Sequence, residues 1–113
     1  MPGSTFHCEV IKSNADEFGN AVATVKCHGR LASGAASEIK DVVKPMIAAG
    51  GRTIIDLGDV DYLDSSGLGA LVGLKVSAVK QGFCILEFAQ MTPRVMELLR
   101  ISNLAQFLSS KAS

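Results

Sequence analysis

Paired serines, preceded by an aspartate and followed by a glycine, lie near the middle of the chain in the run Asp64-Ser65-Ser66-Gly67-Leu68-Gly69. The pattern predicts a helix that begins at the serines, directly after a buried strand and a short acidic loop. Backbone N–H groups and the helix dipole concentrate positive potential at such a position, so a phosphate can be held there. The chemistry that this pattern favours is a covalent switch at a serine hydroxyl.

An ordinary helix cap is the structural alternative for the same residues. Asp64 or Ser65 would then accept a hydrogen bond from the first helical turn and contribute about 1 kcal/mol. A cap does not explain the glycines that follow at Gly67, Gly69 and Gly73, each of which costs a helix interior about 1 kcal/mol relative to alanine. Glycine is tolerated in a helix where another group approaches the backbone closely.

The helix expected over residues Ser66–Gln81 is apolar on more than one side. A stripe that can face a sheet consists of Leu68, Leu71, Val72 and Val79. Lys75 interrupts this stripe. Further apolar residues fall partly outside it; they are Ala70, Leu74, Val76 and Ala78. A helix of this kind is either enclosed within the protein or presents a face to a partner, and the sequence leaves both open.

The whole chain, residues 1–113, is expected to form one α/β domain in the order ββαβαβα, with a small mixed sheet of four to five strands covered by helices. The first two strands are expected to pair as an antiparallel hairpin, followed by a loop over Gly29–Gly34. The strands are predicted at Phe6–Ile11, Ala21–His28, Arg52–Leu57 and Phe83–Phe88, with a short final turn and strand at Ile101–Leu108.

Capping residues and prolines mark the ends of the helices. The first helix is expected over about Ala35–Ala49 and ends at Gly50-Gly51, although Pro45 should kink its last turn or shorten it. Gly82 closes the second helix. The third begins with Thr92 as the N-cap and proline in the first helical position, and runs to about Arg100.

Composition narrows the classes of partner and the compartment. Eleven basic and eleven acidic side chains give no net charge, which argues against nucleic acid or an anionic membrane as the main partner. No apolar run approaches a membrane span, and Met1–Thr5 lack a signal-peptide pattern. The three cysteines, Cys8, Cys27 and Cys84, have no C-x-x-C spacing, which is typical of reduced thiols. A cytoplasmic protein is expected.

Other chemistries find little support in the residue pattern. The acidic residues of the central segment share one strand and loop rather than converging as a cation site requires, and we expect a solvated acidic rim; they are Asp56, Asp59, Asp61 and Asp64. A hairpin turn about Glu17 and Phe18 would place His7 opposite His28 on one face and Cys8 opposite Cys27 on the other. At most two soft ligands then share a face, and a structural zinc site needs four.

Enzymatic activity is not expected. Catalysis by Ser65 would require a neighbouring general base, and the only histidines, His7 and His28, belong to the hairpin. The chain also lacks a G-x-S-x-G elbow. No metal or cofactor is predicted.

The central hexapeptide, preceded by a hydrophobic strand ending in Asp56-Leu57, resembles the signature of bacterial STAS domains, the anti-sigma factor antagonists. The resemblance extends over nearly the whole chain and includes the hairpin, Gly29-Arg30-Leu31 before the first helix, and Thr92-Pro93-Arg94-Val95 at the third. It implies that Ser65 is phosphorylated by an anti-sigma factor that doubles as an ATP-dependent serine kinase. The unphosphorylated protein would bind that partner and free the sigma factor; the phosphorylated protein would release it.

Phosphorylation would act at the docking surface rather than on the fold. The added charge would repel acidic groups and block close packing beside Asp61 and Asp64, while Ser66 is expected to cap the helix with Ser65 pointing outward. The residues expected to contact the partner are Arg30, Asp61, Asp64, Ser66, Gly67, Leu68, Gly69 and Leu74.

One segment departs from the family pattern. Family members commonly have Gly-Glu-Leu-Asp after the second strand, where this chain has Gly29-Arg30-Leu31-Ala32. Related STAS domains act in stress-signalling assemblies or as subunits of lipid and anion transport systems. A non-switching scaffold or transport-complex subunit is therefore the alternative function, and an intact Ser65 favours the phosphorylation switch over it.

Overall fold

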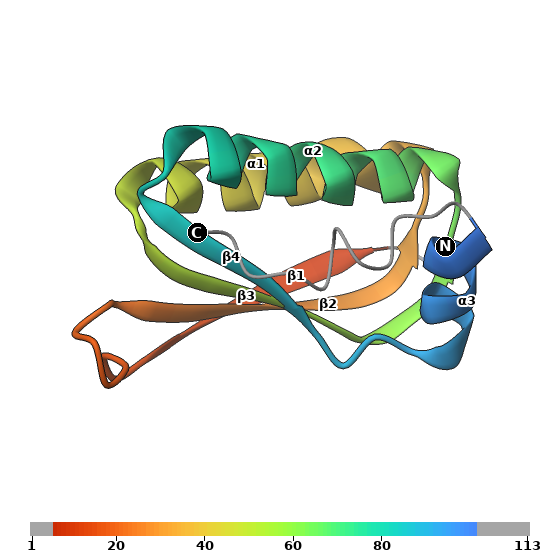
Figure 1. The fold of residues 1–113 in the computed structure, drawn as a ribbon. Coiled ribbons are helices and arrows are strands. Elements are labelled where there is room, and N and C mark those ends of the chain that lie inside the picture. The colour runs from red at the N-terminus through yellow and green to blue at the C-terminus, as the bar shows by residue number, and fades with distance from the viewer. Residues whose placement is uncertain (1–5, 102–113) are drawn as a thin grey trace.

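The computed structural model describes residues 6–101, which form a mixed α/β fold in the predicted order ββαβαβα (Figure 1). The elements are β1 (His7–Ser13), β2 (Val22–Leu31), α1 (Ser33–Ala49), β3 (Gly51–Leu63), α2 (Ser65–Gln81), β4 (Cys84–Ala89) and α3 (Pro93–Ile101). The final turn and strand predicted from Ile101 begins with the last residue of α3 and otherwise lies outside the described residues.

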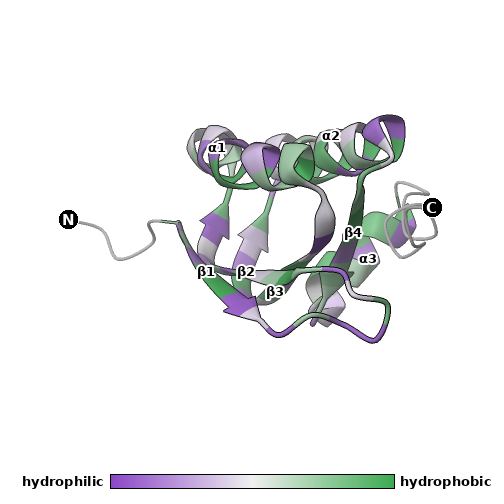
Figure 2. Cartoon of the chain, turned by 90° about the vertical axis from the view of Figure 1, so that its left-hand side faces the viewer, coloured by the Kyte–Doolittle hydropathy of each residue, from purple (hydrophilic) through white to green (hydrophobic). Residues whose placement is uncertain are grey.

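The four strands form one sheet in the order β1-β2-β3-β4. β1 runs antiparallel to β2, whereas β2, β3 and β4 run parallel, as expected when helices connect the later strands. Helices α1 and α2 lie side by side over one face of this sheet, and α3 lies apart from them beyond β4 (Figures 1 and 2). The main core lies between the two helices and the sheet.

The register of the opening hairpin is the one predicted. His7 lies opposite His28 and Cys8 opposite Cys27. The two imidazole rings stack with their centroids 4.6 Å apart. In the turn, the Asp16 carboxylate accepts hydrogen bonds from the backbone N–H groups of Phe18 and Asn20, both at 2.9 Å.

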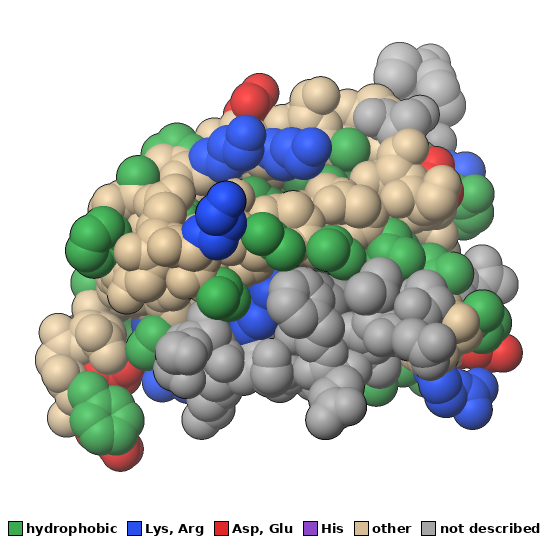
Figure 3. All heavy atoms as spheres, turned by 45° about the horizontal axis from the view of Figure 1, so that its top comes forward, with side chains coloured by type: hydrophobic (Ala, Val, Ile, Leu, Met, Phe, Trp, Pro, Cys, Tyr) green, Lys and Arg blue, Asp and Glu red, His purple; other side chains and the backbone are tan. Residues whose placement is uncertain are grey.

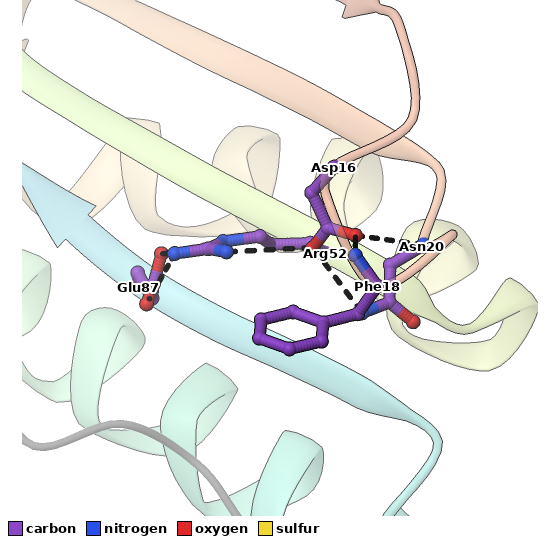
Figure 4. Close-up of polar contacts among 5 residues, drawn as sticks. All are labelled: Asp16, Phe18, Asn20, Arg52 and Glu87. Atoms are coloured by element: carbon purple, nitrogen blue, oxygen red, sulfur yellow. Dashed lines mark hydrogen bonds and ion pairs between the residues drawn. The ribbon is translucent and has the colours of Figure 1, made fainter.

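An arginine ties this turn to the far side of the sheet (Figure 4). Arg52, at the start of β3, donates two hydrogen bonds to the Glu87 carboxylate of β4, at 2.9 and 3.0 Å, and a longer one of 3.4 Å to Asp16. Glu87, through its hydrogen bonds and its charge, raises the pKa of the Arg52 guanidinium. A bidentate contact of this geometry fixes the direction of both side chains.

Strands β2 and β3 are longer than predicted, and this corrects two expected loops. The segment Gly29–Leu31 continues β2, and the acidic segment after Leu57 continues β3 as far as Leu63. The two extensions pair with each other, with register shifts after Lys26 and after Gly29. Pairing with a neighbouring strand outweighs the low strand preference of glycine and aspartate here.

The helix boundaries agree closely with the prediction. α1 continues to Ala49 past Pro45, so the proline does not shorten it, and Gly50 caps it. Gly82 ends α2 in the left-handed conformation, with φ at 75°. Thr92 caps α3, because its hydroxyl oxygen accepts a hydrogen bond from the Val95 N–H at 3.3 Å.

Candidate functional site

The predicted switch segment lies where β3 ends and α2 begins, at the edge of the sheet to which the carboxyl ends of the parallel strands point (Figure 1). Ser65 and Ser66 are the first two residues of α2, and both are exposed. Among the described residues, none makes a hydrogen bond with the Ser65 hydroxyl. This hydroxyl is therefore accessible at the amino end of a helix of 17 residues.

Asp64, not Ser66, is the helix cap. Its Oδ1 atom accepts a hydrogen bond from the Gly67 N–H at 2.9 Å, and its backbone oxygen accepts one from Leu68 N–H at the same distance. The expectation that Ser66 caps the helix is therefore wrong. An aspartate side chain accepts the capping hydrogen bond as a serine would, and its negative charge interacts favourably with the helix dipole. Both serines are consequently left without a capping role.

Gly67 allows the start of α2 to pack directly on the end of β2. A β-carbon at this position would overlap the Leu31 carbonyl oxygen and lie 2.8 Å from Cδ1 of Leu63. This is the close backbone approach that the glycine content predicted, and the approaching group belongs to the protein itself. Gly67 and Leu68 are both buried, so neither residue is on the exposed surface where a partner was expected.

Up to Val79, the outward face of α2 is made of small and apolar residues. Gly69 and Gly73 are exposed and have nothing within 4 Å of a β-carbon built on them. Val76 is 41% exposed and Val79 is 48% exposed, although Val79 was expected in the core stripe. Figure 3 looks onto the two helices and shows hydrophobic side chains in separate patches, with Lys and Arg side chains above them. Gly69, which has no side chain, lies one helical turn beyond the two serines.

Leu74 belongs to the core, which corrects its assignment to the partner surface. It is 1% exposed, and Ala70 and Ala78 are also buried, because α2 packs against α1 as well as on the sheet. Lys75 is buried too, and its ammonium group donates a hydrogen bond of 2.8 Å to the Leu86 carbonyl oxygen of β4. The apolar excess of α2 is thus mostly explained by enclosure within the protein.

Arg30 and Asp61 lie on the extended ends of β2 and β3, beside the start of α2. Both are exposed. The Arg30 guanidinium lies over the ring of Tyr62, with Cζ 4.1 Å from the ring centroid. Such a contact holds a positive charge on an aromatic face. The sequence pattern missed it because Tyr62 faces Arg30 only when both segments are strands.

Three of the four central aspartates have roles within the fold. Asp64 caps α2, the Asp56 carboxylate accepts a hydrogen bond from the Gly58 N–H at 2.8 Å, and Asp59 lies 2.8 Å from Nδ1 of His28. The other ring nitrogen of His28 lies 2.7 Å from the carboxylate of Glu9. Within residues 6–101, no group of three or more His, Cys, Asp or Glu side chains is arranged to hold a metal ion.

A cavity of about 240 Å³ lies at the other end of the parallel strands. It is bordered by the hairpin, the end of α1 and the start of β3, including Lys12, Met46 and Arg52. None of the predicted switch residues lines it. Among the described helices, none is both long and apolar enough to cross a membrane.

Comparison with known proteins assigns this arrangement to a family. A family model described as "Mlab, STAS domain" matches residues 15–109. A STAS-domain containing protein of Pseudomonas aeruginosa (strain UCBPP-PA14) is 34% identical over 83 residues, which is 74% of this chain and 81% of that protein.

Solved structures share the fold at lower identity. The anti-sigma factor antagonist SpoIIAA in its unphosphorylated form has a TM-score of 0.68 at 18% identity, over 96% of this chain and 89% of that one. The phosphorylated form of Bacillus SpoIIAA has a TM-score of 0.65 at 17% identity, over 96% and 92%. A sulfate transporter family protein from Wolinella succinogenes has a TM-score of 0.67 at 24% identity, over 78% and 71%. The sequence matches over most of the chain, together with this fold, show that the chain belongs to the STAS-domain family.

Proposed function

We propose that this chain is a binding module of the anti-sigma factor antagonist type, switched by phosphorylation of Ser65. In its unphosphorylated state it binds an anti-sigma factor with serine kinase activity, and in its phosphorylated state it releases that partner. The observation that carries the proposal is which residue caps α2 and which residue is left exposed beside the cap. Asp64 caps the helix, which leaves the exposed Ser65 hydroxyl free to accept a phosphoryl group from ATP.

A phosphate on Ser65 would leave the helix folded. The amino end of α2 favours an anion through its dipole and its unpaired N–H groups. The phosphate would add a charge of about −1.5 to −2 next to Asp64 and Asp61, at the edge of the outward face of α2. A partner that packs closely there would meet a bulky anion, and an acidic group on the partner would be repelled.

The docking surface that we propose contains fewer residues than the set predicted from the sequence. It consists of Ser65, Ser66 and Gly69 on α2, together with Arg30 and Asp61 at the ends of β2 and β3, all of which are exposed. The half-buried Asp64 lies between the two parts. Gly67, Leu68 and Leu74 support this surface from within the core.

The proposal is tested by capture of a partner and mapping of the phosphorylation site. The Ser65→Ala chain is used as bait in its host, and the captured kinase is incubated with ATP and the wild-type chain, followed by mass spectrometry. Phosphate is expected on Ser65. The Ser65→Asp chain should bind the partner at least about tenfold more weakly. Its new carboxylate would face an acidic group on the partner, and like charges placed together in an interface cost more than about 1.4 kcal/mol, which corresponds to a factor of ten.

Ser66→Asp is the matched control, since it adds the same charge one residue further along the helix. It should weaken binding less than Ser65→Asp does. Equal binding by Ser65→Ala and Ser65→Asp, with no phosphate on Ser65, would reject the switch.

The alternative is a STAS domain that serves as a non-switching scaffold or as a subunit of a stress-signalling or transport complex. One observation favours it: Arg30 is an exposed cation on the surface beside Ser65, where the family commonly has an acidic residue. The likeness in fold to a sulfate transporter family protein also supports it. Under this alternative, Arg30→Glu weakens partner binding while Ser65→Asp has no effect.

A further inference from the structure

Two cysteines face each other across the opening hairpin, away from the Ser65 surface. Cys8 of β1 and Cys27 of β2 are directly opposite in the antiparallel register. Cys8 is half-buried, and Cys27 is fully buried beneath the helices. The pair therefore combines one thiol that solvent can reach with one that it cannot.

The register brings the two residues into the range of a disulfide. Directly opposite residues of an antiparallel pair have Cα atoms about 4.5–5.5 Å apart, whereas disulfides span about 4.4–6.8 Å between Cα atoms. Their side chains leave the sheet on the same face because opposite residues always do. The strands need not separate for the two sulfurs to bond.

The two thiols differ in reactivity. A hydrogen bond from Cys27 lowers the pKa of the Cys8 thiol, against the opposing effects of burial and of Glu38. The same hydrogen bond, with burial, raises the pKa of Cys27. An accessible thiol with a lowered pKa beside a second thiol is the arrangement of redox-sensitive cysteine pairs.

We propose that Cys8 and Cys27 form a reversible intrachain disulfide when the protein meets a peroxide. The Cys8 thiolate attacks one peroxide oxygen of hydrogen peroxide, which yields a sulfenic acid at Cys8 and hydroxide that becomes water. The Cys27 sulfur then attacks the Cys8 sulfur, the S–S bond forms, and the sulfenic oxygen leaves as a second water. Two thiols lose two electrons and two protons, and the peroxide is reduced to two waters.

The bond would fasten the edge strand β1 to β2. β1 is exposed along most of its length and pairs only with β2 within the described sheet. Cys84, in contrast, is buried in β4, where its sulfur lies 3.6 Å from the Thr53 hydroxyl oxygen. Cys84 should stay reduced under the same treatment.

Peptide mapping tests the proposal. The reduced full-length chain is treated with equimolar hydrogen peroxide, alkylated and digested with trypsin. The expected product is a disulfide between peptides 1–12 and 27–30, which contain Cys8 and Cys27. The peptide with Cys84 should be alkylated, the intact chain should be lighter by two hydrogen atoms, and dithiothreitol should restore the original mass.

Three variants make the result decisive. Cys84→Ser should form the same bridge at the wild-type rate. Cys27→Ala should accumulate a Cys8 sulfenic acid that dimedone labels, whereas Cys8→Ala should resist labelling because Cys27 is buried. On oxidation, the thermal midpoint should rise in the wild type and in Cys84→Ser, which form the bridge. It should not rise in Cys8→Ala or Cys27→Ala. Linkage through Cys84, linkage between chains, or oxidation of Cys8 to sulfinic acid without a bridge would overturn the proposal.

Discussion

The backbone of Gly67, in the first turn of α2, lies directly against the carbonyl group of Leu31 at the end of β2. No larger residue fits without moving the helix away from the sheet. Because the same turn carries Ser65 and the Asp64 cap, this contact fixes where the proposed phosphorylation site stands relative to Arg30 and Asp61. The position of the proposed docking surface thus depends on one glycine in the core.

Gly67→Ala should destabilise the protein by at least about 1–3 kcal/mol, the usual range for overpacking. Gly69→Ala, two residues further along the same helix, should stabilise it by up to about 1 kcal/mol, because a β-carbon there meets nothing within 4 Å. Urea unfolding measures both. Equal effects of the two substitutions would show that α2 does not pack on Leu31 as described.

Asp64→Ala should cost about 1 kcal/mol of unfolding free energy, since the Gly67 N–H loses its acceptor. Asp61→Ala removes an exposed aspartate three residues earlier and should change stability by less than about 0.5 kcal/mol. Chemical denaturation separates the two variants. If Ser66→Ala were the more costly change, Ser66 would be the cap after all.

The sequence predicted the element order and the hairpin register because those features depend on local patterns. The turn around Glu17 and Phe18 places Cys8 opposite Cys27 without knowledge of the rest of the chain. The caps at Thr92 and Gly82 are equally local, since each depends on residues within one turn of the helix end.

The predictions from sequence were wrong where segments far apart in the chain pack against each other. Residues 58–63 contain three aspartates or glycines that favour a loop, yet they pair with an equally unpromising segment at Gly29–Leu31. Leu74 was expected at a partner surface but is buried, because α2 packs against α1 as well as on the sheet, and no local pattern specifies the position of α1 beside α2. The cap was assigned to Ser66 because several residues in the run were plausible caps.

Lys75 should make stability depend on alkaline pH. Burial lowers the pKa of its ammonium group from the ordinary value of 10.5, although Glu87 opposes this. Between the lowered pKa and 10.5, the unfolded chain binds more protons than the folded chain, so the unfolding free energy rises as the pH rises through that window.

Lys75→Met should remove most of this increase, at a cost of about 1–3 kcal/mol for the lost hydrogen bond from the ammonium group to the Leu86 carbonyl oxygen. Lys80→Met, at an exposed position of the same helix, should keep the wild-type slope. The measurement is denaturant unfolding from neutral pH to the ordinary lysine pKa. A slope unchanged in Lys75→Met would mean that another group titrates.

The outward face of α2 should tolerate a longer side chain in the free protein but not in the complex. Gly69→Gln replaces an exposed glycine, four residues after Ser65, with a good helix former, so stability should rise by up to about 1 kcal/mol. Partner binding should fall at least about tenfold, or about 1.4 kcal/mol, because the added side chain would separate the two surfaces that we propose meet at the α2 backbone.

Ala48→Gln is the matched control for this face. It adds a comparable side chain at an exposed position near the end of α1, away from the start of α2. Binding to the partner captured by the Ser65→Ala chain, measured by calorimetry, should be unchanged in this variant. A loss of affinity in Ala48→Gln but not in Gly69→Gln would move the docking surface from α2 to α1, and would leave phosphorylation of Ser65 without a direct means of blocking the partner.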